Sequence, residues 1–310
     1  MSVISRATAL LVSSVLAGSC SGSDELTGPI PPEAAAAEAS PSQPGSSEPT
    51  PALKAKDFSP SMFGKDSTTI DNQWLPMLPG TQLSFRGSTI EGKERITHQV
   101  VFTVTDLTKE ILGVRNRVIW ELDYTEGVLV EAELALFAQD LKGNIWHFGQ
   151  YPEEYKNGKF VDAPAWIAGV AGARPGITMK AEPSLDAPSY SQGYAPPPIN
   201  WIDRARTYKQ DQRTCVPVDC YDGVLITEEF EVDKPGAWQL KYYAPGVGNV
   251  RVGWRGRNEK ERETLVLIEA RQLTLAQLEK AHAQLLELEA HAYEILEDVY
   301  GNTPPALPTA

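Results

Sequence analysis

Three glutamates and one histidine are the residues of this sequence best suited to chemistry. Glu121, Glu131, Glu133 and His147 lie on segments in which polar and apolar residues alternate, so all four are expected on one face of neighbouring strands. Paired carboxylates can bind a cation or share a proton, and a nearby histidine can act as acid or base. The simpler interpretation is a solvated outer face on which Arg117 shields Glu133.

The turn between the first two of these strands sets how the carboxylates face each other. A three-residue loop at 125–127, with Gly127 in the left-handed position, would place Leu122 opposite Val130 and Glu121 opposite Glu131. A two-residue loop would set Leu122 against Glu131 and mix the two faces. We therefore expect the three-residue loop, and like charges directly opposite each other then cost stability unless something compensates them.

A second predicted hairpin adds the strand that carries the histidine. The same loop shape at 141–143 would place Ala138 opposite Trp146 and Leu136 opposite Phe148. The three strands then share one apolar face, and the glutamates and His147 lie on the reverse face.

A glycine-rich segment at 166–179 is a second candidate binding element. Its backbone N–H groups, together with Arg174 and Trp166, could hold an anion such as a carboxylate. The alternative is a structural loop in which glycine permits close packing of the backbone.

The sequence predicts no metal site and no cofactor. Cys215 and Cys220 lie five residues apart and are expected to form a disulfide, because zinc would need two further soft ligands nearby. Asp140 and Asn144 bracket a turn but lack the remainder of a calcium loop. A weak calcium site on the glutamates is the one metal alternative left open. No serine or cysteine nucleophile has a supporting motif.

Alternating hydrophobicity over residues 81–267 predicts a mainly β fold. Segments such as 100–104 and 250–254 are typical of half-buried strands, and they recur at short spacing with glycine-containing turns. The sheet should be antiparallel. We expect a β-barrel or a strongly curved half-barrel, and a two-sheet sandwich is the alternative.

A single C-terminal helix should follow the last strand and end at Gly301. Thr274 is the expected N-cap, with Gln277 three residues later. The apolar stripe consists of Leu278, Ala281, Leu285, Leu288, Ala292, Ile295 and Val299. We expect this stripe to pack on the protein's own sheet or across the barrel mouth, with self-association through paired helices as the alternative. His282 and His291 point to opposite sides of the helix and are expected at the surface.

The chain divides into five regions by composition. These are an export signal (1–19), a Pro/Ser/Ala-rich tether (20–56), the antiparallel β domain (57–272), the helix (273–301) and a flexible tail (302–310). The segment LAGSC, which ends at Cys20, resembles the bacterial lipoprotein cleavage box, although Ala17 stands where leucine is usual. This resemblance implies that a lipid is attached at Cys20. The protein would then be located in the cell envelope, either in the outer membrane and periplasm or at the cell surface. An ordinary signal cleaved nearby is the alternative.

Charge and length limit the classes of partner. The 310 residues include 41 acidic and 28 basic side chains, a net charge of −13. Without Arg6, 27 basic residues remain against 41 acidic ones, so the mature charge is −14. Such a charge repels nucleic acid. An apolar content of 42% supplies a core, but no apolar run reaches the ~20 residues that span a bilayer.

Three segments carry a resemblance to a known group of proteins. IDNQWLPMLPGT (70–81), AQDLKGNIWHFGQY (138–151) and KYYAPGVGNV (241–250) resemble an uncharacterised family of secreted bacterial proteins and lipoproteins. The resemblance implies export and a β-rich fold, and it assigns no catalytic residue.

Two classes of function fit these observations. The first is a membrane-tethered binding or envelope-accessory protein for a small molecule or glycan. The second is an extracytoplasmic lyase or hydrolase that uses the carboxylates and His147. The two differ in whether these side chains line a cavity or face open solvent.

Overall fold

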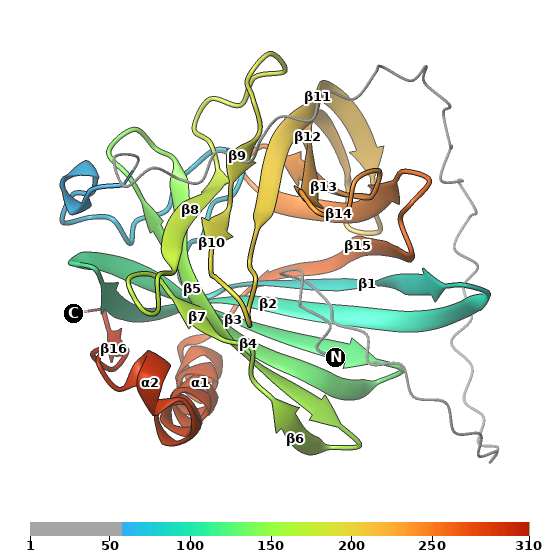
Figure 1. Ribbon diagram of the computed structural model, residues 1–310. Helices are drawn as coiled ribbons and strands as arrows, with labels where there is room; N and C mark the ends of the chain where they lie inside the picture. Colours follow the sequence, from blue (N-terminus) through green and yellow to red (C-terminus); the bar gives the residue numbers. More distant parts are fainter. Residues whose placement is uncertain (1–57, 310) are drawn as a thin grey trace.

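The computed structural model describes residues 58–309, and the predicted signal, tether and Cys20 lie outside this range. Within it, thirteen strands follow one another in a single antiparallel sheet that curves into a nearly closed barrel, as the alternation of the sequence predicts (Figure 1). The order is β10-β8-β5-β4-β3-β2-β1-β15-β14-β13-β12-β11-β9.

Two meanders of long strands form most of the wall. The first is β1 (Thr81–Glu91), β2 (Glu94–Ile111), β3 (Val114–Thr125), β4 (Val128–Gln139) and β5 (Ile145–Lys156). The second is β11 (Asp203–Cys215), β12 (Cys220–Glu231), β13 (Trp238–Ala244), β14 (Gly248–Arg255) and β15 (Glu261–Gln272). They join where β1 pairs with β15.

Short elements complete the sheet and its surroundings. They are the 3-10 turn η1 (Pro60–Met62), β6 (Lys159–Asp162), β7 (Trp166–Ile167), β8 (Arg174–Met179), β9 (Tyr190–Ser191), β10 (Gly193–Tyr194) and β16 (Leu307–Pro308). β9 pairs with β11 and β10 pairs with β8, so a turn at Gln192 brings the two ends of the sheet together. The backbone N–H of Gln192 donates to the Asp203 carbonyl at 2.9 Å.

The β3–β4 hairpin differs in register from the prediction. Its turn is the two-residue Glu126-Gly127, both residues having positive φ (52° and 79°), and a bulge follows next to Asp123. The bulge restores the separation of faces that a plain two-residue turn would lose. The predicted faces are therefore right, but Glu121 lies opposite Glu133 rather than Glu131.

The β4–β5 hairpin follows the prediction at its turn and departs from it farther along. Ala138 pairs with Trp146 as expected. A bulge then places Leu136 opposite Gly149 rather than Phe148. Gly149 has φ 142°, and a Cβ there would lie 2.4 Å from the Trp166 carbonyl oxygen, so only glycine lets β7 approach so closely.

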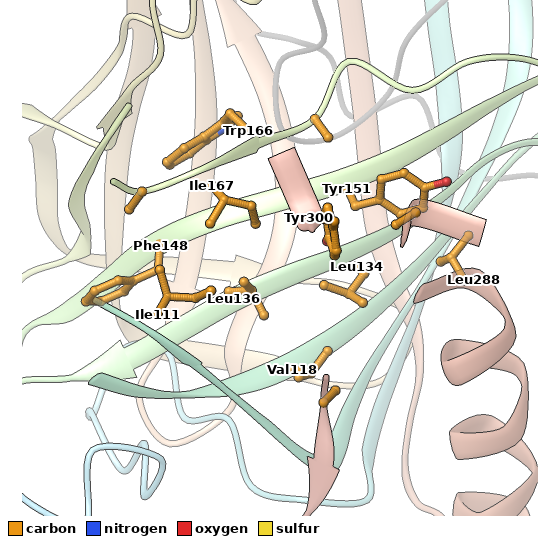
Figure 2. Close-up of a cluster of buried hydrophobic side chains, with 14 of the residues drawn as sticks. Ile111, Val118, Leu134, Leu136, Phe148, Tyr151, Trp166, Ile167, Leu288 and Tyr300 are labelled. Atoms are coloured by element: carbon orange, nitrogen blue, oxygen red, sulfur yellow. The ribbon is translucent and has the colours of Figure 1, made fainter. Parts of the chain in front are cut away.

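The apolar face of β3–β5 points out of the barrel and is covered by the C-terminal helix α1 (Leu275–Ile295). Ala281, Leu285, Leu288 and Ala292 pack in one cluster with strand residues such as Leu134 (Figure 2). Figure 1 shows α1 beneath β2–β4. The predicted stripe is thus buried against the protein's own sheet, and the buried part is unavailable for pairing with a second helix. Ile295 remains exposed.

The ends of the helix show one agreement and one difference. Thr274 caps α1 in a capping box with Gln277, as predicted. The helix stops at Ile295 rather than continuing to Gly301, and a separate turn, α2 (Glu297–Tyr300), follows.

Polar contacts fasten the helix and the tail to the barrel. Buried Lys109 on β2 donates to Glu289 at 2.8 Å and to the Pro304 carbonyl at 2.6 Å. The tail, expected to be flexible, adds β16 next to β2. The helix histidines, expected at the surface, each meet a carboxylate of the sheet: His282 pairs with Asp106, and His291 with Glu153.

The three segments that carry the family resemblance meet at one end of the barrel. Ile70, Leu75 and Met77 fill the interior there. The side-chain oxygen of Gln139 accepts hydrogen bonds from the N–H groups of Asp71 and Asn72. The β13–β14 turn joins them, since Gly246 N–H donates to the Gln73 carbonyl at 2.8 Å. The first segment is therefore a plug that the other two hold in place.

The predicted disulfide is present. Cys215 and Cys220 pair directly across the β11–β12 hairpin and are bonded to each other, with Cα atoms 4.0 Å apart. The bond closes the turn in which Val216 N–H donates to the Asp219 carbonyl.

Candidate functional site

The barrel encloses a partly open cavity of about 130 Å³. Its lining comes from both meanders, from β8 and from the plug, which places it inside the barrel. The apolar lining residues include Leu75, Met77, Leu83, Phe85, Val100, Phe102, Ile119, Ala135, Phe137, Val252 and Leu265. The polar ones include Glu121, Glu133, His147, Gln192, Asp203, Glu229, Gln239 and Lys241.

Glu121 and Glu133 are directly paired neighbours on β3 and β4. Glu133 is 6% exposed, and one of its oxygens accepts a hydrogen bond from Gln150 at 3.0 Å. Burial raises the pKa of Glu133 to about 8, and the adjacent charge of Glu121 adds to the shift. Burial and the charge of Asp123 likewise raise the pKa of Glu121 to about 7, against the opposing effect of Lys241. Both carboxyls therefore hold protons to much higher pH than free glutamate.

Lys241 comes from β13 in the second meander and is bound to a different carboxylate. Its Nζ lies 2.9 Å from Glu229, which also accepts a hydrogen bond from Gln192 at 3.1 Å. Burial opposes the charge on Lys241, but the charge of Glu229 and its hydrogen bond outweigh burial and raise the lysine pKa. Lys241 is therefore a fixed positive charge that already has a partner.

A buried ion network lies beside the cavity. His98 on β2 contacts Asp123 at 2.5 Å through Nε2 and Glu263 at 2.8 Å through Nδ1. Burial alone would lower the pKa of His98, but hydrogen bonds and charge from the two carboxylates raise it to about 10. Gln239 donates to the other oxygen of Glu263 at 2.7 Å. His98 is therefore a permanent cation at neutral pH.

The solvated outer face expected for the glutamates is wrong. Curvature of the sheet turns that face inward, so Glu121, Glu133 and His147 line the cavity. Glu131 lies on the same face of β4, two residues before Glu133, and is 2% exposed. Burial, and then the charge of Glu133, raise its pKa well above the usual range.

Arg117 does not shield Glu133. It is buried nearer the plug, where it donates to the carbonyls of Thr68 and Thr105 and to the hydroxyl of Thr309. Its role is to join the residues just before the plug, β2 and the tail.

His147 is a neutral packing residue in this structure. Burial lowers its pKa to about 3, despite an opposing hydrogen bond with the Gly149 carbonyl at 3.1 Å. Its ring is stacked on Phe137 at 4.8 Å and meets Trp166 edge-on at 4.9 Å. The imidazole can therefore shape the cavity wall but does not carry a charge at neutral pH.

The two ligand-binding candidates of the glycine-rich segment, Trp166 and Arg174, are not brought together with the glutamates, although Thr178 of the same segment lines the cavity. Trp166 lies behind His147 and does not line the cavity. Arg174 lies over the Tyr194 ring at 5.0 Å and is likewise absent from the lining. A Cβ on Gly176 would stand 2.2 Å from the Gly193 nitrogen, so this glycine serves the close packing of β8 against β10.

Sequence reasoning missed the residues that face the glutamates from other strands. Lys241, Gln239, Glu229, His98 and Glu263 were not singled out. The available signal was the same alternation: Gln239, Lys241 and Tyr243 occupy one face of β13. This alternation points to the cavity only if the barrel is assumed to close, because closure turns this face of β13 toward the glutamate face of β3 and β4.

Within residues 58–309 the structure shows neither a cluster of metal ligands nor a helix suited to a bilayer. No group of three or more His, Cys, Asp or Glu side chains is placed to hold a metal ion. No helix in this range has both the length and the apolar character needed to cross a bilayer. Asp140 acts in its turn as expected, since it accepts hydrogen bonds from the N–H groups of Lys142 and Asn144.

Fold and site together define a nearly closed antiparallel barrel with a charged internal cavity. Two solved structures are similar to it. A Bacteroides fragilis NCTC 9343 protein named as an exported protein with a YmcC-like fold matches 65% of this chain and 100% of its own, with 12% identity and a TM-score of 0.39. A Parabacteroides distasonis ATCC 8503 protein named as a lipoprotein also covers 65% of this chain and 100% of its own length, with 13% identity and a TM-score of 0.34.

The resemblance to secreted bacterial proteins and lipoproteins is thus matched only by a distant structural likeness. No protein-family model matches the sequence, and no curated protein is significantly similar to it.

Proposed function

We propose that this chain is an exported binding protein, anchored to the cell envelope through a lipid on Cys20, that holds a small ligand inside its barrel. One observation carries the binding role: a cavity whose lining combines apolar side chains with charged ones from several strands. The apolar wall supplies affinity, and the polar groups select and orient the ligand. A cavity of about 130 Å³ suits a small molecule or one end of a larger one.

Native mass spectrometry of the purified mature protein tests the binding role directly. We expect a small molecule that stays with the folded protein and leaves on denaturation. A matched variant, Ala135→Trp, would fill part of the cavity and should lose that molecule, whereas Ser61→Ala on the exposed 3-10 turn should keep it. Retention that is unaffected by Ala135→Trp would contradict binding in the barrel.

Lipid attachment needs its own test. The chain with its signal should partition into membranes and show a lipid-modified Cys20 by mass spectrometry, and Cys20→Ser should be released into the soluble fraction. An unmodified Cys20 in soluble wild-type protein would remove the anchor from the proposal.

A lyase or hydrolase remains the second candidate, because the cavity holds a directly paired carboxylate couple. A carboxyl with a pKa of about 7 can donate and accept a proton near neutral pH, as Glu121 could. If the retained molecule is a substrate, Glu121→Gln should still bind it but stop its conversion. Equal conversion by both proteins would exclude Glu121 as the catalytic acid or base, and no conversion by wild type would leave binding as the one supported role.

A further inference from the structure

We propose that the ligand of the barrel cavity is a small amphipathic cation, namely a protonated amine on an apolar body. This inference rests on the proposed binding function and names the chemical class that the cavity accepts.

The cavity fits one apolar ring or a short branched chain. An engineered apolar cavity of about 150 Å³ binds benzene, and the cavity here is about 130 Å³ and partly open. Phe85, Phe102 and Phe137 contribute aromatic surface to the apolar wall. The body of the ligand therefore belongs against this wall.

The charged lining favours a positive group on the ligand. Four carboxyl groups line the cavity, from Glu121, Glu133, Asp203 and Glu229, against Lys241 as the one lysine or arginine in the lining. Lys241 is already bound to Glu229 at 2.9 Å. An ammonium group would therefore find acceptors here once Glu121 and Glu133 release their protons, whereas a carboxylate or phosphate would find Lys241 as the one fixed cation of the lining, already paired with Glu229.

Two unpartnered oxygen atoms support the same assignment; they belong to residues outside the cavity lining, on the strands that carry Glu121 and Glu133. Within the described range, no residue donates a hydrogen bond to Oε2 of Glu131 or to Oδ2 of Asp123. These two side chains are 2% and 1% exposed, and they lie on the inward face with Glu121 and Glu133. Buried acceptors without donors are costly, and a ligand that brings N–H donors into the interior relieves that cost.

Binding of a cation should release protons. The groups that act on Glu121 are His98 on β2, Asp123 on β3, Lys241 on β13 and Glu263 on β15, and Glu133 lies opposite it on β4. With this balance, Glu121 and Glu133 hold protons near neutral pH. An ammonium group placed beside them favours their ionised form, so protons leave as it binds.

The test is calorimetry on the mature chain with three probes of equal size and different charge: benzylamine, benzyl alcohol and benzoate. We expect benzylamine to bind about tenfold or more tightly than benzyl alcohol, because it adds charge-assisted hydrogen bonds. Benzoate should bind weakest. Titrations in buffers of different ionisation enthalpy should show proton release with benzylamine near pH 7 and none with benzyl alcohol.

The double variant Glu121→Gln/Glu133→Gln should lose the preference for benzylamine and keep its affinity for benzyl alcohol. Glu126→Gln, on the exposed β3–β4 turn, is the matched control and should behave as wild type. Both glutamines keep the shape of the cavity, so loss of folding is not expected.

The outcomes separate the two proposals. Benzyl alcohol binding as tightly as benzylamine, or benzoate binding best, would overturn the cation and leave binding in the barrel intact. Failure of all three probes, together with no retained molecule in native mass spectrometry, would overturn both.

Discussion

Replacing Glu133 by glutamine should stabilise the protein at neutral pH. In the folded state this carboxyl is 6% exposed and its pKa is raised to about 8 by burial and by the neighbouring Glu121. The unfolded chain has the ordinary value of 4.5. Near pH 7 the protein must therefore take up a proton at Glu133 in order to fold. Glutamine removes this requirement, and its side-chain oxygen can still accept the hydrogen bond from Gln150.

The size and sign of the effect follow from the two pKa values. A raised folded-state pKa gives stability that is complete below about 4.5 and is lost as pH rises through about 8. At about pH 7 the difference from 4.5 is about 2.5 units, and ~1.36 kcal/mol per unit gives about 3 kcal/mol. We therefore expect Glu133→Gln to match wild type near pH 4.5, to be about 3 kcal/mol more stable near pH 7, and to gain little more above about pH 8.

Urea denaturation at several pH values, with thermal melts alongside, measures this difference. A gain of about 3 kcal/mol corresponds to a rise in Tm of about 6 °C for a domain of this size. Glu126→Gln on the exposed turn should change stability by no more than about 0.5 kcal/mol. If the curves of wild type and Glu133→Gln run parallel from about pH 5 to 8, Glu133 is not the buried acid described above, and the proton release expected on cation binding loses its basis.

Three further predictions use the same measurements. Glu131→Gln should also stabilise the protein near neutral pH and lose that advantage near pH 4.5, because burial and Glu133 raise the pKa of Glu131. His98→Gln should cost about 3–5 kcal/mol near pH 6 by leaving Asp123 and Glu263 without their cation. That cost should shrink toward pH 10, where wild-type His98 itself deprotonates. Leu285→Ala should cost about 2–5 kcal/mol in urea, since Leu285 is fully buried under the sheet; a smaller loss would mean that α1 contributes little to packing.

Local periodicity was sufficient to predict the strands and their faces. The alternation of polar and apolar residues with a period of two can be read from each segment alone. The shared face of Glu121 and Glu133 could therefore be recognised before the pairing of the strands was known. The exact partner could not, because the bulge next to Asp123 shifts the register by an amount that the alternation does not record. The cap at Thr274 and the Cys215–Cys220 bond were predictable for the same reason, since both depend on neighbouring residues.

Closure of the barrel depends on contacts between segments that are distant in the sequence. The alternation pattern could not predict which of these segments pair. β1 pairs with β15, about 180 residues away, as in the pair Leu83↔Ala270. This pairing turns the glutamate face inward and brings Lys241 into the same cavity. An open sheet with the same alternation would have left Glu121 and Glu133 in water with nearly ordinary pKa values.

The C-terminal helix explains how the barrel tolerates so many buried charges. On β3–β5 the strongly apolar face points outward, and the side chains of α1 bury it there, so much of the core lies between helix and sheet. A barrel with an uncovered outer face would need its interior for the core. Here the interior of these strands can carry Glu121, Glu133 and Glu131 at raised pKa, at a cost in stability that packing around Leu285 and Leu288 offsets. Apolar residues would fit these positions and would make the fold more stable. Carboxyls kept around a cavity despite their cost in stability are therefore more consistent with selection for a ligand than with selection for stability alone.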